Sequence, residues 1–212
     1  MLRPPPAPEL PPPEYTRRPL ELTPELLLAF PNCAGGSVNH ARCDGLGAGA
    51  GFGGSALWHV LPYFAFGGTL NALRFGFNPP GSAHMQDGRA SGLFYGLVGR
   101  VYFSDHGPVE PYLELGLGSG IATRTQAREA DGVSYTETAG GGAVRIGGAV
   151  ELYVSRQLRL GPALAWTRFR IGRPQRCDPA QSCAELDPQQ NGHGIGFLTF
   201  SARLTILLGP GL

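Results

Sequence analysis

Apolar and polar residues alternate along the C-terminal end of the chain. In "GFLTFSARLTILLG", residues 196–209, every second residue from Leu198 onward is apolar, whereas the intervening positions carry Arg203 among Thr and Ser. Successive side chains of a strand point to opposite faces, so this period of two predicts a β-strand with one apolar face and one mostly polar face. Because an arginine is costly to desolvate, the two faces must meet different surroundings.

The same alternation recurs through most of the chain and predicts an all-β protein. The predicted strands cover about residues 20–30, 45–58, 63–77, 90–104, 110–124, 137–155, 157–171 and 193–208. The first segment also permits a short helix, since Thr23 and Pro24 resemble a helix N-cap and first turn.

The connections between these strands alternate in length. Strands two and three, four and five, and six and seven are joined by the short segments "HVLPY", "SDHGPVE" and "SRQ", whereas the other four connections are long. In an antiparallel up-and-down arrangement, the long connections all fall at one end of the sheet and the short turns at the other.

Charged residues fall in only one of the two registers over most of the strands. The apolar register contains no charge until Arg74 and Arg168, near the long connections. The opposite register carries many of the small residues and the charged residues Glu21, Glu25, Arg100, Glu114, Arg145, Glu151, Arg159 and Arg203. Small residues suit the crowded concave side of a barrel, so we expect the charges to point inward. The apolar face then points outward, which is favourable only in lipid.

Aromatic residues of the apolar register gather near its two ends, as expected at membrane interfaces. They are Trp58, Phe64 and Phe103 beside the short turns, and Phe30, Tyr95, Trp166 and Phe200 towards the long connections. Aromatic residues scattered over a soluble core are the alternative interpretation.

On these features, residues 20 to 208 resemble the small eight-stranded outer-membrane barrels of the OmpA/OmpX/OmpW-like class. The resemblance implies an eight-stranded antiparallel up-and-down transmembrane β-barrel in a bacterial outer membrane, in contact with outer-membrane lipid. Pro24 and Pro162 depart from the pattern, because each removes a hydrogen-bond donor from a sheet without edges.

We expect the inward charges to pair with one another. The lumen of an eight-stranded barrel is just filled by side chains, and an unpaired charge there costs several kcal/mol. The expected pairs are Arg100 with Glu114, Glu151 with Arg159, and Arg203 with Glu21 or Glu25. This lumen charge network predicts a salt-bridged plug; an ion or proton path is the alternative.

The four cysteines form two close pairs, Cys33 with Cys43 and Cys177 with Cys183, both in long connections. Neither pair has the spacing of a zinc site, so we expect two local disulfides formed in an oxidising compartment.

Composition supports two regions, a Pro-rich linker over residues 1–19 and a barrel domain over 20–212. A net charge of +1 does not indicate binding to nucleic acid. No apolar leader follows Met1, so either the chain is intracellular or a signal peptide has been removed from it. The two cysteine pairs favour an exported chain. The linker could meet another envelope component.

Three motifs indicate catalysis or cofactor binding only weakly. The spacing of Gly49, Gly51 and Gly54 matches a dinucleotide loop but lies within an alternating strand. The candidates for a loop metal site are His40, His84, His193 and Asp87, and those for a nucleophile are Ser91 and Ser119, which lack a clear His partner. We therefore predict no catalytic residue, metal or cofactor, and no enzyme activity.

The predicted function is an outer-membrane scaffold or adhesive surface protein with a plugged lumen and disulfide-pinned extracellular loops. The alternatives are a narrow channel or transporter for small hydrophobic molecules, a lipid-modifying enzyme, and a soluble lipocalin-like carrier.

Overall fold

The computed structural model describes the strands and short turns of the chain. The described residues are 18–32, 46–77, 88–104, 107–127, 134–171, 175–177, 183–185 and 195–209. The linker prediction for residues 1–19 therefore falls almost wholly outside them, as do Cys33, Cys43, His40, His84 and His193.

Eight long strands form the body of the molecule. Their bounds are β1 (Leu20–Asn32), β2 (Leu46–Leu61), β3 (Phe64–Phe77), β4 (Gly88–Tyr102), β5 (Val109–Ala127), β6 (Ser134–Ser155), β7 (Leu158–Ile171) and β10 (Ile195–Leu208). The eight strands predicted from alternation are confirmed, with boundaries shifted by up to three residues.

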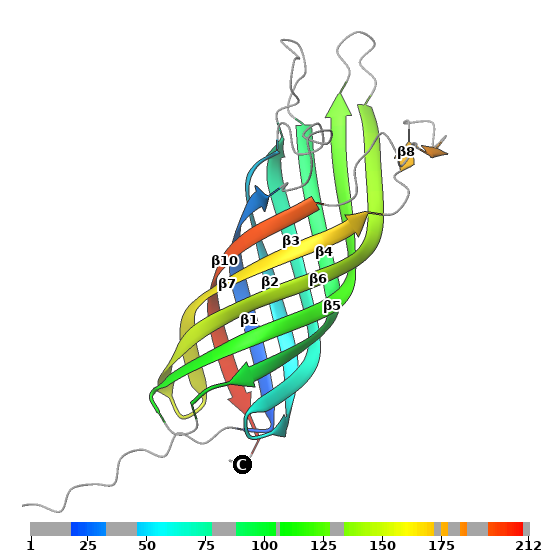
Figure 1. The fold of residues 1–212 in the computed structure, drawn as a ribbon. Coiled ribbons are helices and arrows are strands. Elements are labelled where there is room, and N and C mark those ends of the chain that lie inside the picture. The colour runs from blue at the N-terminus through cyan, green and yellow to red at the C-terminus, as the bar shows by residue number, and fades with distance from the viewer. Residues whose placement is uncertain are drawn as a thin grey trace, which may run out of the picture.

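The eight strands close into an antiparallel barrel (Figure 1). Each strand pairs with its neighbour in the chain, β7 pairs with β10, and β1 pairs with β10 to close the seam. Strand β1 pairs with β10 on one side, where Leu20 lies opposite Leu208, and with β2 on the other, where Leu20 lies opposite Trp58. The short-helix alternative for this segment is therefore wrong.

Two very short strands extend from the barrel wall. β8 (Gln175–Cys177) pairs with β6, and β9 (Cys183–Glu185) pairs with β8. Alternation could not reveal them, since three residues are too few for a periodic signal. They lie at the long-connection end, beside the upper part of β6 (Figure 1).

Neighbouring residues of one strand meet opposite surroundings. In β1, Glu25 is 6 % exposed, whereas Leu26 is 71 % exposed. In β10, Arg203 is 1 % exposed between the exposed residues Ala202 and Leu204. The expected inward direction of the charges and outward direction of the apolar residues is therefore what the structure has.

The two prolines singled out from the sequence, Pro24 and Pro162, lie where the ladder is locally open. The β1–β10 pairing skips Thr23 and Pro24, and Pro24 is paired only with Gly54 of β2. Pro162 pairs with Ala202 of β10, while the β6–β7 pairing is interrupted at this position. A missing N–H is tolerated there because no partner on that side requires it.

No helix among the described residues is long and apolar enough to cross a membrane.

Candidate functional site in the barrel lumen

Charged side chains and one histidine, from most of the barrel strands, meet inside the lumen in the half nearer the short turns. We call this set the charge network, and each member is at most 6 % exposed. It comprises Glu21, Glu25, His59, Arg100, Glu110, Glu114, Arg145, Glu151, Arg159 and Arg203.

Glu114 of β5 is the centre of one part of the network. Its carboxylate accepts two hydrogen bonds from the guanidinium of Arg203, each 2.8 Å long, across the barrel from β10. Arg145 Nε donates to the same carboxylate at 3.0 Å, and Arg100 Nε does so at 3.3 Å. Three guanidinium groups thus share one carboxylate, and Arg203 also binds Glu25 at 2.8 Å.

Glu21 of β1 and Arg159 of β7 form the second centre, closer to the short turns. Arg159 donates to Glu21 and to Glu110, and its Nε lies 3.2 Å from Glu151. Glu21 is also 2.6 Å from His59 Nε2 and lies near Arg100 at 3.6 Å. These contacts link the two centres, because Arg100 touches both Glu21 and Glu114.

Hydroxyl groups satisfy much of the remaining hydrogen-bonding capacity. Tyr102 donates to Glu21 at 2.6 Å, and Tyr112 donates to Glu151 at 2.8 Å. Tyr112 also accepts a hydrogen bond from Arg203, and Thr205 donates to Glu151. Buried charges are stable only when paired and hydrogen-bonded in this way.

The structure brings together all eight charged residues named from the sequence and contains the three expected pairs. Arg100 lies directly opposite Glu114, and Arg203 lies directly opposite Glu25 rather than Glu21. Arg159 contacts Glu151 but lies opposite Tyr153, because the β6–β7 register shifts near the turn. The expected pair of Glu151 with Arg159 therefore forms, although the two residues do not lie directly opposite each other on the strands.

Sequence reasoning missed several polar members of the lumen, including Glu110, His59 and Asn71. Glu110 was placed at the edge of the turn segment "SDHGPVE", and His59 lay one residue beyond the predicted strand end. Asn71 was a neutral residue in an alternating strand; with its amide turned to match its neighbours, it donates to Glu25 at 2.6 Å and accepts from Arg145 at 3.0 Å. Glu110 and His59 could have been found by extending the parity of β5 and β2 into the turns.

These additions change the charge balance that the sequence predicted. Four acids and four bases were expected, but the described lumen holds five carboxylates and four guanidinium groups. His59, in contact with Glu21, is the additional basic group.

The half of the lumen nearer the long connections is filled by apolar side chains. We call Phe75, Phe94, Phe169 and Phe197 the aromatic layer. The rings of Phe75 and Phe197 stack with centroids 4.7 Å apart, and Phe169 meets Phe197 edge-on at 5.5 Å. Leu27 and Leu73 pack against these rings. The expectation that the inward face holds mainly charges and small residues was therefore incomplete.

A small cavity separates the charge network from the aromatic layer. Its volume is about 10 Å³, and its lining includes Asn71, Arg145, Phe94 and Phe197. A cavity of this size holds about one water molecule. The lumen is thus filled by side chains at this level.

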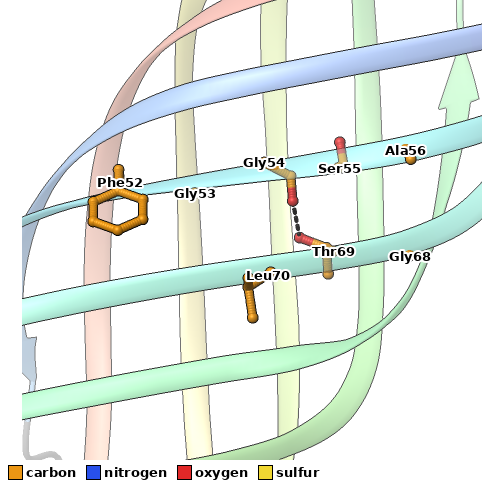
Figure 2. A pocket seen from close by; sticks show the side chains of 8 residues that line it. All are labelled: Phe52, Gly53, Gly54, Ser55, Ala56, Gly68, Thr69 and Leu70. Atoms are coloured by element: carbon orange, nitrogen blue, oxygen red, sulfur yellow. Dashed lines mark hydrogen bonds between the residues drawn. The ribbon is translucent and has the colours of Figure 1, made fainter.

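The outer wall carries a shallow depression over β2 and β3 (Figure 2). Its volume is about 530 Å³, and it forms where Gly54, Ala56 and Gly68 leave space beside Phe52 and Leu70. The β2–β3 pairing is continuous behind it, and Thr69 donates a hydrogen bond to the Gly54 carbonyl. The depression is therefore a feature of the surface and not an opening into the lumen.

The remaining sequence motifs have structural positions in the strands. Gly49, Gly51 and Gly54 lie within β2, and at Gly51 a Cβ would lie 1.9 Å from the Ala72 carbonyl oxygen. These glycines therefore permit close approach of two strands. Within the described ranges, no three His, Cys, Asp or Glu side chains are arranged to hold a metal ion. The expected lack of enzyme activity and cofactor stays a prediction.

One predicted disulfide lies among the described residues. Cys177 and Cys183 are joined and close the β8–β9 hairpin.

Comparison with known proteins shows similarity in fold and not in sequence. No protein-family model matches the chain, and no curated protein matches its sequence. OprG from Pseudomonas aeruginosa matches with a TM-score of 0.57 at 10 % identity, over 93 % of this chain and 99 % of that one. Neisserial surface protein A matches with a TM-score of 0.54 at 12 % identity, over 89 % and 97 %.

A third solved structure is similar over its whole length. Ail, the attachment invasion locus protein of Yersinia pestis, in complex with the heparin analogue sucrose octasulfate, has a TM-score of 0.52 at 10 % identity, over 90 % of this chain and 99 % of that one. The closed antiparallel barrel, its outward apolar face and these structural similarities show that the chain has the fold of the small eight-stranded outer-membrane β-barrels.

Proposed function

We propose that this barrel is a closed outer-membrane scaffold that presents its long connections at the cell surface, with an adhesive role. The filled lumen is the observation that carries the proposal. Arg159 and Glu151 are fully buried, and the cavity above the charge network is only about 10 Å³ in volume. A hydrated ion would have to displace paired side chains, which is costly in a low-dielectric interior.

The distribution of connection lengths supports a role at one end of the barrel. The turns at Pro62–Tyr63 and Arg156–Gln157 are two residues long, whereas the connections at the other end span residues 33–45, 78–87, 128–133 and 172–194. Outer-membrane barrels carry their longer loops outside the cell. The Cys177–Cys183 disulfide limits the conformations of the last of these segments.

The proposed scaffold has two partners within the cell envelope. Outer-membrane lipid covers the apolar face, and the Pro-rich segment 1–19 could contact another envelope component. Two proteins of similar fold are named for a surface or an attachment locus, which is compatible with a surface role.

Conductance tests the closed lumen. The full chain in planar bilayers should give no stable single-channel steps, whereas replacing Phe75 and Phe197 by Ala together with Arg203→Ala should open a water path. Phe200→Ala, on the lipid-facing side of the same strand, is the matched control and should stay silent. Regular steps from the wild-type protein would reject the closed scaffold in favour of a channel.

Surface exposure tests the presentation of the long connections. An epitope tag inserted in residues 78–87 should be labelled by antibody on intact cells, whereas a tag in the Arg156–Gln157 turn should be labelled only after the outer membrane is opened. Cells carrying the tagged, correctly assembled protein should then be compared with a deletion strain for attachment. Equal attachment of the two strains would reject the adhesive role but not the scaffold role.

A further inference from the structure

The lipid-facing side of the barrel carries charges of only one sign. In the outward register of the eight barrel strands, the charged residues that the structure describes are all arginines: Arg74, Arg89, Arg168 and Arg170. All four are exposed, and each lies within four residues of the strand end nearest the long connections. The five buried carboxylates face the lumen instead.

The first two of these arginines are neighbours on the β3–β4 wall. Arg74 of β3 pairs in register with Ser91, and Arg89 lies two residues before Ser91 on β4. Such diagonal neighbours on one face lie roughly 7–8 Å apart. Their long side chains can therefore reach one anionic group between them.

The other two arginines lie on β7 and face the same outward direction. Arg168 and Arg170 are two residues apart, a separation of about 7 Å along a strand. Trp166 precedes them in the same register and lies at the edge of the apolar surface. Tryptophan at this position marks a membrane–water interface, so the guanidinium groups lie at the level of lipid headgroups.

Neither pair has an acidic partner within the barrel. Among the residues that the structure describes, no hydrogen bond or ion pair joins Arg74, Arg89, Arg168 or Arg170 to another side chain, whereas Arg100, Arg145, Arg159 and Arg203 are all paired. Arginines beside an apolar belt extend their charged ends towards the interface, where anions are available.

We propose that Arg74 with Arg89, and Arg168 with Arg170, form two binding sites for the phosphate groups of anionic lipids in the outer leaflet. Guanidinium groups bind phosphate through parallel N–H···O hydrogen bonds, and a pair of them neutralises a doubly charged group. The continuity of both pairs with the apolar surface favours a lipid over a soluble polyanion. Strands β5 and β6 separate the two pairs on one side, and β2, β1 and β10 do so on the other, so each binds independently.

Lipid titration of the full chain tests the sites. Bisphosphorylated lipid A is added to the protein in zwitterionic detergent micelles, and bound lipids are counted by native mass spectrometry. The wild type should retain two lipids, and Arg74→Gln/Arg89→Gln or Arg168→Gln/Arg170→Gln should each retain one. Each arginine removed should weaken binding at its own site about fivefold, and the Arg→Lys pairs should retain most of it.

Controls separate phosphate recognition from general adhesion of lipid. Arg156→Gln removes an exposed arginine at the short-turn end and should leave both sites intact. Enzymatically dephosphorylated lipid A should bind at neither site. Inorganic phosphate should compete only weakly, since it lacks the acyl chains that the apolar wall holds.

Several results would overturn the proposal. They are equal binding of the dephosphorylated lipid, unchanged stoichiometry in the variant lacking all four arginines, and stronger binding of heparin than of lipid A at these positions. Heat-modifiable gel migration verifies that each variant is folded. The proposal rests on the outer-membrane placement of the proposed function but not on a closed lumen, so a conducting barrel with intact lipid sites would reject only the closed scaffold.

Discussion

The two halves of the lumen are filled by opposite chemistry. Beside the short turns, five carboxylates and four guanidinium groups are buried in mutual contact, whereas beneath the long connections four phenylalanine rings pack together. Asn71 and Arg145 form the boundary, because both line the small cavity below Phe94 and Phe197. Side chains fill both halves, but only the charge network depends on every member having a partner.

This difference predicts different responses to truncation. A removed ring leaves a cavity whose cost follows the lost volume. A removed guanidinium leaves carboxylates buried without compensation, and this cost follows the number of partners. The following variants separate the two effects by urea unfolding in lipid vesicles.

Arg203→Ala should have the largest effect. Arg203 contacts Glu25, Glu114 and Tyr112, so its loss leaves two carboxylates under-compensated. We expect a loss of about 3–5 kcal/mol in the free energy of unfolding, the usual cost of breaking a buried pair. Adding Glu25→Gln should restore part of this stability, because it removes one of the uncompensated charges.

Leu204→Ala is the control for Arg203, since its side chain faces outward one residue away. It should cost much less, because lipid replaces the lost contacts. Equal losses for the two variants would mean that the lumen is hydrated enough to solvate Glu25 and Glu114.

Phe197→Ala should have the next largest effect. Its ring contacts Phe75 and Phe169 and is 2 % exposed. We expect a loss of about 3 kcal/mol, at the lower end for Phe→Ala because water can enter from the nearby barrel mouth. Adding Glu25→Gln to Phe197→Ala should not restore stability, whereas adding it to Arg203→Ala should.

Phe200→Ala tests whether this cost comes from the lumen. Phe200 lies three residues along β10 on the outward face, where its ring meets Phe30 edge-on. A larger loss for Phe200→Ala than for Phe197→Ala would contradict the description of the aromatic layer as the packed part of the upper lumen.

The contrast between the two halves also explains what the sequence could predict. Alternation predicted the positions of the strands and the inward direction of the Arg203 side chain. When one register of a strand carries a charge and the other carries Leu, only the Leu register can face lipid at low cost. The closure of β1 on β10 followed from the even number of strands. The β8–β9 hairpin could not be predicted, since it depends on pairing with β6 and not on its own pattern.

The lumen was predicted less completely than the wall. Phe197 shares a register with Arg203, yet an apolar residue in the inward register carries no signal of its own, because the outward register is also apolar. His59 lay one residue beyond its predicted strand, and Glu110 was the first residue of its predicted strand, where it also belonged to a turn segment. Cross-barrel contacts such as Glu114 with Arg203 need the closed geometry, which fixes which strands face one another.

His59→Phe should have a smaller effect than either truncation. The ring of His59 stacks on Tyr102, a contact that phenylalanine keeps. Glu21 loses its hydrogen bond with His59 but keeps those from Tyr102 and Arg159. We expect a loss of about 1 kcal/mol, the net value of one hydrogen bond. A loss as large as that of Arg203→Ala would show that His59 is a required cation of the network, balancing the fifth carboxylate.

Cys177→Ser/Cys183→Ser should have the smallest effect on the barrel. The disulfide closes a hairpin that pairs with β6 outside the closed wall of eight strands. The free energy of unfolding of the barrel in urea should change by no more than about 0.5 kcal/mol, as for surface substitutions. Protease cleavage between β8 and β9 should become faster because the open hairpin samples more conformations. A matched reduction experiment on the wild type should give the same two results. If the double variant instead unfolds the barrel as readily as Phe197→Ala does, the hairpin is part of the cooperative core, and the separation between a filled lumen and an independently pinned surface hairpin does not hold.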